Sequence, residues 1–344
     1  MLSLNRPLNK AKVQKNDEFY TQLSDIEKEL KHYKAHFKNK VVLCNCDDPR
    51  ISNFFHYFSY NFEALGLKKL IATCYKNQNA DLFSRNDSEK AIYLEYIGDK
   101  NDNNIPDTDE IGIKYLKGDG DFRSQECIEL LKQSDIVCTN PPFSLFREYV
   151  AQLIEHKKKF LIIGDQNAIT YKKIFLLIKK NKIWLGVDNG GTKWFQVPLH
   201  YKIKTQARIK VENGVKFFSK GSIMWFTNLD HKKRHQNLIL YRKYNPKDYP
   251  KYDNYDVIEV SKVADIPVGY NGIMGVPITF LDKYNPEQFE VLGLDDHRIQ
   301  YPKLAGCNSI NGKQIYRRII IRNKESLNEN RTQRNYRRGI NKRV

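Results

Sequence analysis

Four short apolar segments, separated by stretches with helical periodicity, most strongly constrain the fold of this chain. They are rich in Val, Ile and Leu, end in polar or turn-forming residues, and span 41–46, 68–75, 134–140 and 159–165. Between them, apolar residues recur at helical spacing, as at Phe54, Phe58 and Leu65. Buried strands that alternate with such helices are typical of a parallel, doubly wound sheet. We therefore predict an α/β fold.

The sequence changes character after Gly190 and Gly191. Short strand-like pieces separated by turn signals follow or flank this point, at 182–186, 215–218, 222–226 and 237–241. From about residue 230 onward the chain is basic, rich in tyrosine and without clear periodicity. We predict an α/β domain over 1–230 and a mixed, basic region over 231–344.

Charge is divided unevenly between the two parts of the chain. Residues 1–150 hold 21 Lys and Arg against 23 Asp and Glu, whereas residues 151–344 hold 37 against 17. A one-signed surface repels itself unless an opposite charge meets it, and nucleic acid is the commonest such partner. The alternative is a solvated basic face, but the asymmetry favours a nucleic-acid partner.

Other whole classes of protein are disfavoured. No apolar run approaches the roughly 20 residues that a membrane span requires, and the polar N-terminus lacks a secretory signal. The six cysteines show no zinc-ligand spacing, and four lie in or beside apolar strand-like segments. We expect a reduced cytoplasmic protein with no membrane contact and no metal.

The sharpest chemical signal is Asn140-Pro141-Pro142-Phe143, directly after the third apolar segment. The Asn140 side-chain oxygen and the Pro141 carbonyl oxygen can accept both hydrogens of an exocyclic amine. Phe143 offers a ring on which a heterocycle can stack, and the two prolines keep the loop rigid. These groups suit methylation of an amino group on a base flipped out of a duplex. The alternative is an ordinary strand-to-helix turn, which Asn-Pro also favours.

Two more polar segments are candidates for ligand binding. GDGDF (118–122), one strand before the loop 140–143, contains glycines that permit close backbone approach. Its Asp121 can accept from an adenine amine and Phe122 can pack on the adenine ring, although Gly-Asp-rich turns are also common as plain structure. Asp47 and Asp48 end the first strand, where carboxylates can bind an ammonium group or hydroxyls. They can equally cap the following helix.

With DEFYTQ (17–22), LCNCDDP (43–49), WFTNL (225–229) and YRRIIIRNK (316–324), these motifs resemble the EcoRI adenine-specific methyltransferase family over nearly the whole chain. The resemblance implies a Rossmann-like, S-adenosylmethionine-dependent catalytic domain and a C-terminal target-recognition region. It implies a site-specific DNA adenine methyltransferase of restriction–modification type, acting on a flipped adenine in a short duplex sequence.

The resemblance also suggests roles for individual residues. The expected catalytic loop is Asn140, Pro141, Pro142 and Phe143. The expected cofactor-binding residues are Tyr20, Thr21, Cys46, Asp47, Asp48, Tyr75, Asp121 and Phe122. Phe143 is expected to stack on the target base, and Trp225 to supply a second ring. The glycine-rich GxG that methyltransferases usually carry after the first strand is missing here.

Double-stranded DNA and S-adenosyl-L-methionine are the expected partners. Phosphate contacts are expected from basic clusters at Lys232, Lys233, Arg234, Arg242 and Lys243 and in the tail 331–343. Contacts with DNA are expected to begin near residue 188. We expect a nucleoid-associated monomer, with a cognate restriction endonuclease acting on the same site without direct contact.

Two other functions stay open from the sequence alone. The same loop suits an amino-methyltransferase that acts on RNA or on a protein glutamine. A catalytically silent DNA-binding regulator that retains the fold is the non-enzymatic alternative. Transfer of label to RNA or DNA distinguishes the first from the main hypothesis, and cofactor binding tests the second.

Overall fold

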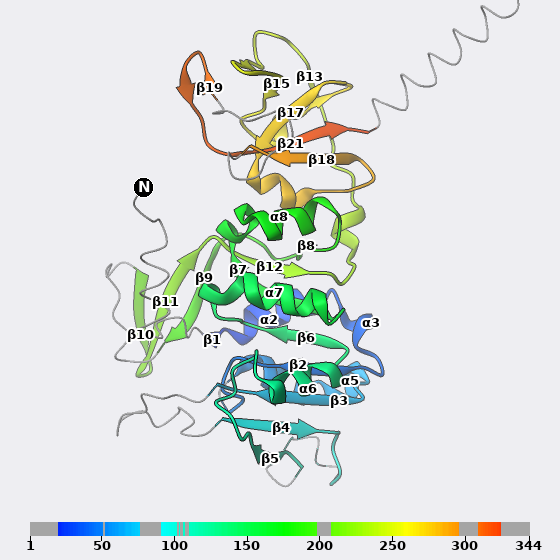
Figure 1. Ribbon diagram of the computed structural model, residues 1–344, viewed down its shortest axis with the longest axis vertical. Helices are drawn as coiled ribbons and strands as arrows, with labels where there is room; N and C mark the ends of the chain where they lie inside the picture. Colours follow the sequence, from blue (N-terminus) through cyan, green and yellow to red (C-terminus); the bar gives the residue numbers. More distant parts are fainter. Residues whose placement is uncertain are drawn as a thin grey trace, which may run out of the picture. The chain divides into compact units, whose positions relative to one another are not determined.

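The structure is a computed structural model, in which the chain forms two compact units (Figure 1). The residues that it describes are 20–50, 52–75, 91–101, 103, 106, 110–197, 208–295 and 309–324. The first unit comprises the described parts of 1–169 and 185–230, and the second those of 170–184 and 231–344. Within the described parts, no helix is long and apolar enough to cross a membrane.

The described part of the first unit is built on an eight-stranded sheet in the order β5-β4-β3-β2-β6-β7-β12-β8. The four predicted strands lie at its centre and pair in parallel: β3 (Lys69–Thr73), β2 (Val41–Cys44), β6 (Ile136–Thr139) and β7 (Lys159–Asp165). The flanking strands are β4 (Ile92–Tyr96), β5 (Gly112–Tyr115), β12 (Ile223–Thr227) and β8 (Trp184–Leu185). β4, β5 and β12 are antiparallel to their inner neighbours. The α/β class is confirmed, but the sheet is mixed rather than wholly parallel.

Helices pack on both faces of this sheet (Figure 1). On one side are α2 (Leu23–Leu30), α3 (Lys34–Phe37), α4 (Asn53–Tyr60) and α5 (Phe62–Leu65); α6 (Gln125–Gln133) and α7 (Phe146–Glu155) are on the other. Consecutive residues of β12 show the division, because strand side chains alternate between faces. Trp225 packs edge-on against Phe54 of α4, and Phe226 packs against Phe146 of α7.

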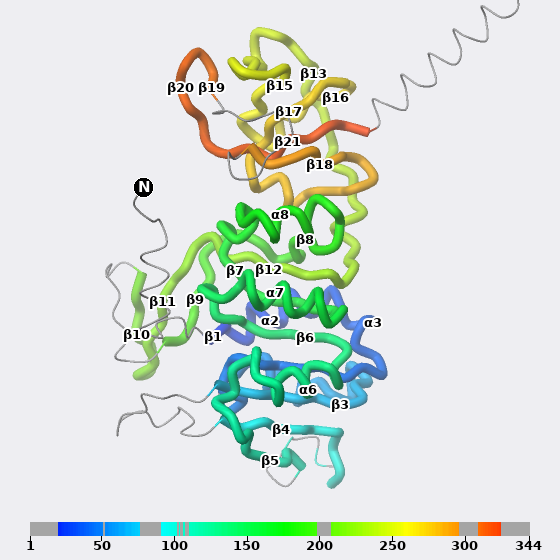
Figure 2. Tube along the Cα trace, viewed as in Figure 1, coloured from blue at the N-terminus to red at the C-terminus, as the bar shows by residue number. Residues whose placement is uncertain are grey.

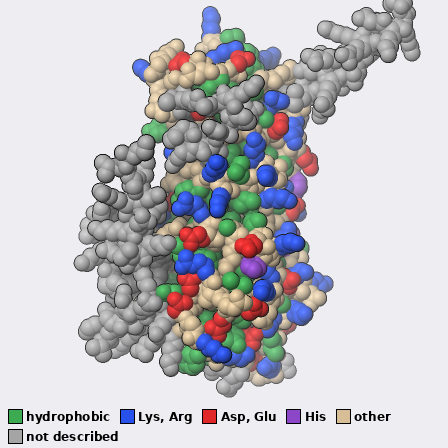
Figure 3. Space-filling view, viewed as in Figure 1, with side chains coloured by type: hydrophobic (Ala, Val, Ile, Leu, Met, Phe, Trp, Pro, Cys, Tyr) green, Lys and Arg blue, Asp and Glu red, His purple; other side chains and the backbone are tan. Residues whose placement is uncertain are grey.

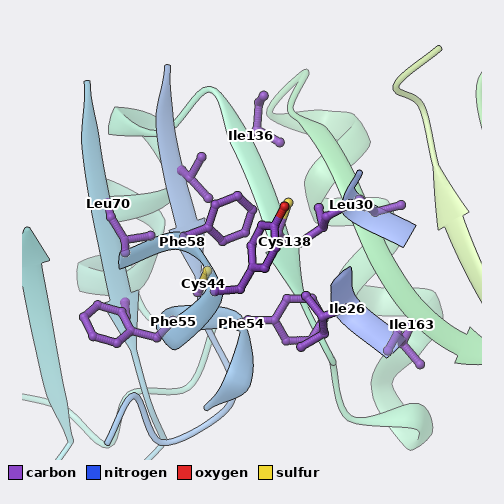
Figure 4. Close-up of a cluster of buried hydrophobic side chains, with 14 of the residues drawn as sticks. Ile26, Leu30, Cys44, Phe54, Phe55, Phe58, Leu70, Ile136, Cys138 and Ile163 are labelled. Carbon is purple, nitrogen blue, oxygen red and sulfur yellow. The ribbon is translucent and has the colours of Figure 1, made fainter. Parts of the chain in front are cut away.

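The main core lies between the sheet and the first group of helices (Figure 4). Alternate strand residues such as Cys44, Leu70 and Cys138 meet the aromatic side chains of α4 there, including Phe58. Each of these side chains is at most 3% exposed. Burial of this apolar surface is the dominant stabilising contribution to the unit. It also fixes the positions of the strand ends that carry the polar motifs.

A smaller antiparallel sheet stands beside the main one within the same unit (Figure 2). Its order is β1 (Tyr20–Thr21), β9 (Thr192–Val197), β11 (Val215–Gly221) and β10 (Ile209–Glu212). Ser222, with φ of 62°, connects β11 to β12 of the main sheet. The small sheet is thus joined covalently to the main sheet next to β7.

The second unit is ordered over its described residues despite its weak sequence periodicity. It contains α8 (Lys172–Lys179) and a sheet of β14 (Lys251–Tyr252), β15 (Tyr255–Glu259), β17 (Ile273–Pro277), β21 (Arg318–Asn323) and β18 (Phe289–Leu294). Two short pairs are β13 (Arg242–Lys243) with β16 (Pro267–Val268) and β19 (Ser309–Ile310) with β20 (Lys313–Gln314). Its interior includes an ion pair of 2.6 Å between Arg318 and Glu259.

Short 3-10 helices complete the described structure: η1 (Phe143–Leu145), η2 (Gln166–Thr170), η4 (Lys232–His235), η5 (Val263–Asp265) and η6 (Ile278–Lys283). The strand-like piece 237–241 forms no strand, which corrects the sequence expectation. Its backbone is bound by a side chain instead, because Gln288 accepts from the amide of Leu238 and donates to its carbonyl oxygen.

Candidate functional site

The polar motifs lie at the carboxyl ends of the parallel strands. Residues 45–48 follow β2, residues 140–143 follow β6, and Asp165 ends β7. Because parallel strands present these ends along the same edge, the three segments lie on one side of the sheet. This edge is where open α/β sheets bind their ligands.

The loop after β2 replaces the missing glycine motif with an unusual backbone conformation at Cys46. Its φ is 83°, in the left-handed region that normally favours glycine. The thiol is packed among other groups, and this burial raises the pKa of Cys46. Cys46 is therefore an uncharged side chain at a glycine-like turn position, a role that residue type alone does not reveal.

Asp48 belongs to the same loop and is held by Arg50. The guanidinium Nη2 lies 2.5 Å from Oδ2 of Asp48, and the Arg50 amide donates to Oδ1 at 3.0 Å. The backbone oxygen of Asp48 accepts from the amide of Ser52 at 2.8 Å. Asp48 is 7% exposed, whereas its neighbour Asp47 is half-buried. Asp48 thus orders the turn that precedes α4, beside the more accessible carboxylate. It does not cap the helix, because the N-cap residue is Ser52 and no side chain caps it.

Tyr20 and Thr21 are brought to this loop by the small sheet. Tyr20 pairs with Gln196 and Thr21 with Phe195, and the side-chain amide of Asn53 donates to the Thr21 carbonyl oxygen at 2.7 Å. Thr21 is 2% exposed, and its Oγ1 has no hydrogen-bond partner among the described residues. A buried hydroxyl without a partner is costly unless a ligand or water satisfies it. This orphaned oxygen therefore fits a polar ligand.

The loop 118–122 packs against the end of β3. Gly120 has φ of 76°, and a Cβ atom there would collide with the carbonyl oxygen of Cys74. By contrast, the nearest atom to a Cβ on Gly118 would be 4.0 Å away, on Glu126. Only Gly120 needs to be glycine for this close approach. The contact brings Tyr75 close to the loop, where burial and the nearby Asp119 and Asp121 raise the Tyr75 pKa.

The expected adenine-ring residues are both present in this loop with protein partners of their own. The carboxylate of Asp121 binds Arg123, with Nη2 2.6 Å from Oδ2. Arg123 also reaches Glu148 at 3.0 Å. Phe122 is 7% exposed, and its ring lies edge-on to Tyr149 with centroids 5.0 Å apart. Asp121 is thus a partly exposed member of an ion-pair network, and its neighbour Phe122 belongs to a buried aromatic pair with Tyr149.

The catalytic-loop candidates form a compact turn between β6 and η1. Asn140 is 6% exposed, and Phe143 is 9% exposed. The Pro142 carbonyl oxygen accepts from the Leu145 amide at 3.0 Å, which closes the first turn of η1. Proline restricts the backbone torsions of Pro141 and Pro142. The loop therefore presents an amide, a carbonyl and a ring in a fixed order at the strand end.

Asn45 connects this loop to the loop after β2 and was not among the predicted residues. Its backbone oxygen accepts from the Thr139 hydroxyl, and its side-chain oxygen accepts from the Tyr149 hydroxyl. Its place between a buried strand and two aspartates was a signal that could have identified it. Asp165 could have been identified in a similar way, because it is the polar residue that ends the fourth predicted strand. Lys220 had none, because its approach to Phe143 depends on the pairing of distant strands.

Trp225 is a correction to the sequence-based expectation. The residue is fully buried in β12, and its ring lies edge-on to Phe54 with centroids 6.0 Å apart. A Cβ on Gly186 would lie only 2.6 Å from the Trp225 Cβ, so neighbouring backbone packs directly against it. No face of this indole is available to a base. The sequence motif around Trp225 instead marks a core strand.

The predicted phosphate-binding residues belong to the second unit and differ in their surroundings. In η4, Lys232 is exposed, Lys233 binds Asp282 at 2.7 Å, and Arg234 stacks over Trp184 at 4.0 Å. The following strand β13 carries the remaining two, Arg242 and Lys243, which are both exposed. The basic residues at 331–343 lie outside the described residues.

The distribution of charged side chains and of possible metal ligands limits the chemistry that the site can perform. Acidic and basic side chains are intermixed on the visible face of the first unit (Figure 3). Across the part of the chain that the structure describes, no group of three or more His, Cys, Asp or Glu could hold a metal ion. The site thus consists of carboxylates, an orphaned hydroxyl, an amide and an aromatic ring at one sheet edge.

Comparison with known proteins identifies the family of this chain. A family model described as the adenine-specific methyltransferase EcoRI matches residues 7–343. The chain belongs to this family. It is 54% identical over 328 residues to the Type II methyltransferase M.EcoRI of Escherichia coli, covering 93% of this chain and 97% of that one.

Two mycoplasma relatives of the EcoRI methyltransferase family match over a similar length. Identity is 41% over 335 residues to the Type II methyltransferase M.MgeORF184P of Mycoplasma genitalium, covering 92% of this chain and 98% of the relative. It is 38% over 334 residues to the Type II methyltransferase M.MpnI of Mycoplasma pneumoniae, covering 93% and 98%. The similarity therefore includes both units.

Proposed function

We propose that this member of the EcoRI methyltransferase family transfers a methyl group from S-adenosylmethionine to the exocyclic amine of a flipped adenine in a short DNA duplex sequence. The observation that carries the proposal is the loop 140–143 at the carboxyl end of β6, in a chain that matches the family over residues 7–343. The enzyme class follows from the family. The roles of individual residues are our inference from their surroundings.

The first unit is the proposed cofactor-binding, Rossmann-like domain. Thr21 offers its orphaned hydroxyl, Asp47 a half-buried carboxylate, and Cys46 a glycine-like turn, all near the carboxyl end of β2. These groups fit the ammonium and hydroxyl groups of S-adenosylmethionine, which supplies an electrophilic methyl group when bound. Three further residues are assigned to the cofactor site: Tyr20, Asp48 and Tyr75. We infer that they position these groups through the backbone contacts of the loop after β2 and of the loop 118–122.

The adenine end of the cofactor is assigned to the loop 118–122. Asp121 can accept a hydrogen bond from an amine once its carboxylate is shared between that amine and Arg123, 2.6 Å away. Phe122 holds this loop in place by packing its ring against that of Tyr149. The ion pair is partly exposed, and partly exposed pairs contribute little free energy, so this sharing costs little.

The target base is assigned to the catalytic loop. The side-chain oxygen of Asn140 and the backbone oxygen of Pro141 accept the two hydrogens of the amine, which leaves the nitrogen lone pair available as the nucleophile. The ring of Phe143 stacks on the base and recovers part of the energy lost on unstacking. The prolines hold these acceptors in place, so orientation supplies much of the catalysis.

Proton transfer needs no dedicated general base in this arrangement. The amine carries a positive charge after methylation and is then acidic enough to lose a proton to water. Asn140 and Pro141 stabilise the developing charge, because both oxygens accept hydrogen bonds from the charged amine. Residue roles are thus limited to orientation and electrostatic stabilisation.

The second unit is the proposed target-recognition region. Lys232 and Lys243 are exposed cations suited to phosphates. Arg242 is also exposed, but it pairs with Asp265 at 3.4 Å, and Lys233 and Arg234 likewise have partners within the unit. Exposed basic side chains that contact phosphates position a protein on DNA without reading its sequence. We further propose that the enzyme acts as a monomer and that a restriction endonuclease recognises the same sequence independently.

Expression in a methylation-free bacterial host, followed by single-molecule sequencing that detects modified bases, tests the proposed function. The expected result is methylated adenine in one short motif, and none with Asn140→Ala. Asn167→Ala is the matched control, because Asn167 is an exposed asparagine that follows the neighbouring strand β7. It should methylate like the wild type.

Other outcomes would favour the alternatives. Modified cytosine would retain the mechanism and change the base. Unmodified DNA with label transfer to RNA or to a protein glutamine would replace the substrate class. Unmodified DNA with bound cofactor and no transfer to any substrate would indicate a DNA-binding protein without activity. Equal methylation by Asn140→Ala and the wild type would contradict the role of the loop.

A further inference from the structure

Lys220 lies directly over the aromatic residue of the catalytic loop. Its Nζ atom is 4.4 Å from the centroid of the Phe143 ring. The same ammonium group is 3.2 Å from Oδ2 of Asp165, at the end of β7. The side chains of Lys220 and Asp165 are 26% and 23% exposed, so solvent reaches both partners.

The backbone fixes this arrangement on regular structure. Lys220 is in β11, paired with Lys193 of β9, and β12 begins only three residues later. Asp165 pairs with Ile223 of β12, and the amide of Gln166 donates to the Ser222 carbonyl oxygen at 2.7 Å. The two charges are therefore brought together where β11 of the small sheet leads into β12 of the main sheet.

Little of the Phe143 side chain is open to solvent. Phe143 is 9% exposed and belongs to the same buried cluster as Phe195 and Ile163. The ammonium group covers a ring face, because it lies over the centroid. A base that stacks on Phe143 therefore has to take the place of this ammonium group.

We propose that Lys220 is a positioning residue for the flipped nucleotide. In the free enzyme its ammonium group covers the ring face of Phe143. When the base enters, the ammonium group leaves that face and binds the phosphate of the same nucleotide. This inference rests on the proposed function, since it assumes that the target adenine stacks on Phe143.

When the base enters, one attractive interaction with the Phe143 ring replaces another. An ammonium group over an aromatic face and a base stacked on that face are both attracted to the ring. Lysine is a compact cation on a flexible stem, so the group can move several ångströms without a backbone change. A phosphate is the strongest anion that a flipped nucleotide brings within reach. Asp165 is the resting partner that keeps the ammonium near the loop in the absence of DNA.

Charge-removing and charge-preserving variants of Lys220 test the inference. Lys220→Met retains the length of the side chain and removes the charge, whereas Lys220→Arg retains the charge. Lys210→Met is the matched control, because Lys210 lies in the same small sheet, over the rings of Trp194 and Phe217 at 4.9 and 5.2 Å. That lysine is paired with Glu212 at 2.9 Å.

Binding is measured on the duplex that the wild type methylates, over a range of salt concentrations. For Lys220→Met we expect the KM for DNA to rise about tenfold, as for loss of one charged hydrogen bond, with kcat nearly unchanged. The slope of log K against log salt should fall by about one, as for one lost phosphate contact. Lys220→Arg should restore the slope, and Lys210→Met should match the wild type.

Base entry is measured by fluorescence of 2-aminopurine at the target position. We expect Lys220→Met to give a weaker flipped signal than the wild type at the same subsaturating DNA concentration, and an equal signal at saturating DNA. A wild-type salt slope, KM and fluorescence in an active Lys220→Met protein would overturn the inference. So would a lower melting temperature with unchanged KM among the folded molecules, which would indicate a structural ion pair only.

The proposed function and the role of Lys220 can be tested separately. If the wild type methylates DNA and flips the base while Lys220→Met behaves identically, only the role of Lys220 is wrong. If the wild type methylates no DNA, the proposed function is wrong, and the inference is overturned with it. Unchanged binding of S-adenosylmethionine by Lys220→Met is expected in either case, because Lys220 contacts Phe143 and Asp165.

Discussion

The hydroxyl of Tyr149, on α7, donates a hydrogen bond to the side-chain oxygen of Asn45, in the loop after β2. Tyr149 is fully buried, and burial raises its pKa, so the hydroxyl stays protonated and remains a donor. The ring of the same residue supports Phe122. One side chain thus connects the helix after the catalytic loop to both segments that we assign to the cofactor.

Tyr149→Phe should lower stability and weaken cofactor binding together. The substitution leaves the Asn45 oxygen without its donor, which costs about 1–3 kcal/mol for a buried polar group. The free energy of unfolding from urea titration and the Kd for S-adenosylmethionine are the measurements. Tyr60→Phe is the control, because Tyr60 is 65% exposed. Equal values for the two variants would show that the Tyr149 hydroxyl does not hold the loop.

Gly120→Ala should be far more damaging than Gly118→Ala. The first adds a Cβ against the Cys74 carbonyl oxygen at a φ of 76°, whereas the second adds one at an ordinary contact distance of 4.0 Å from Glu126. Steric overlap and a left-handed backbone together should cost at least about 2 kcal/mol for Gly120→Ala, with a change within about 0.5 kcal/mol for Gly118→Ala. Thermal unfolding with and without S-adenosylmethionine measures both. Similar losses would show that the loop is free to shift away from β3.

Sequence alone identified the parts of the fold that depend on local pattern. The four central strands were predictable because β-branched and other apolar residues run continuously through them, as in Val41–Cys44. The loop 140–143 was predictable because it directly follows such a strand. The antiparallel strand β12 could not be placed, because its apolar residues show burial but not which strand pairs with them. Trp225 was misassigned for this reason.

The site contains features that depend on conformation or on distant pairing. Cys46 takes the place of a glycine through its φ of 83°, and no residue pattern predicts that conformation for cysteine. Lys220 reaches Phe143 only because β11 leads through Ser222 into β12, next to β7. In the second unit, Tyr252 and Arg318 meet at Glu259 from strands far apart in sequence. Such contacts follow from topology.

The edge of the main sheet should lose stability in acid through Glu95. Hydrogen bonds from Lys114 and Lys69 hold the pKa of Glu95 below its ordinary value of 4.5. A lowered pKa in the folded state stabilises the protein above the unfolded value, and this contribution is lost as pH falls through the folded pKa. The difference in unfolding free energy between the wild type and Glu95→Gln should therefore shrink from neutral pH to about pH 3.

Urea titrations at each pH measure this difference. Glu155→Gln is the control, because Glu155 is an exposed carboxylate at the end of α7. A difference for Glu95→Gln that stays constant with pH would show that the two lysines do not favour the charged form.

Phe143→Leu should separate the two contributions of this ring, core packing and base stacking. Leucine fills much of the volume that Phe143 occupies in the buried cluster, but it has no aromatic face. We expect Phe143→Leu to lower kcat/KM for DNA. The loss corresponds to about 1–3 kcal/mol of transition-state stabilisation, the usual contribution of a base–aromatic contact. Phe143→Tyr should retain most activity, because the ring face is preserved. If Phe143→Leu and Phe143→Tyr are equally active, packing rather than stacking explains the aromatic residue, and the base lies elsewhere.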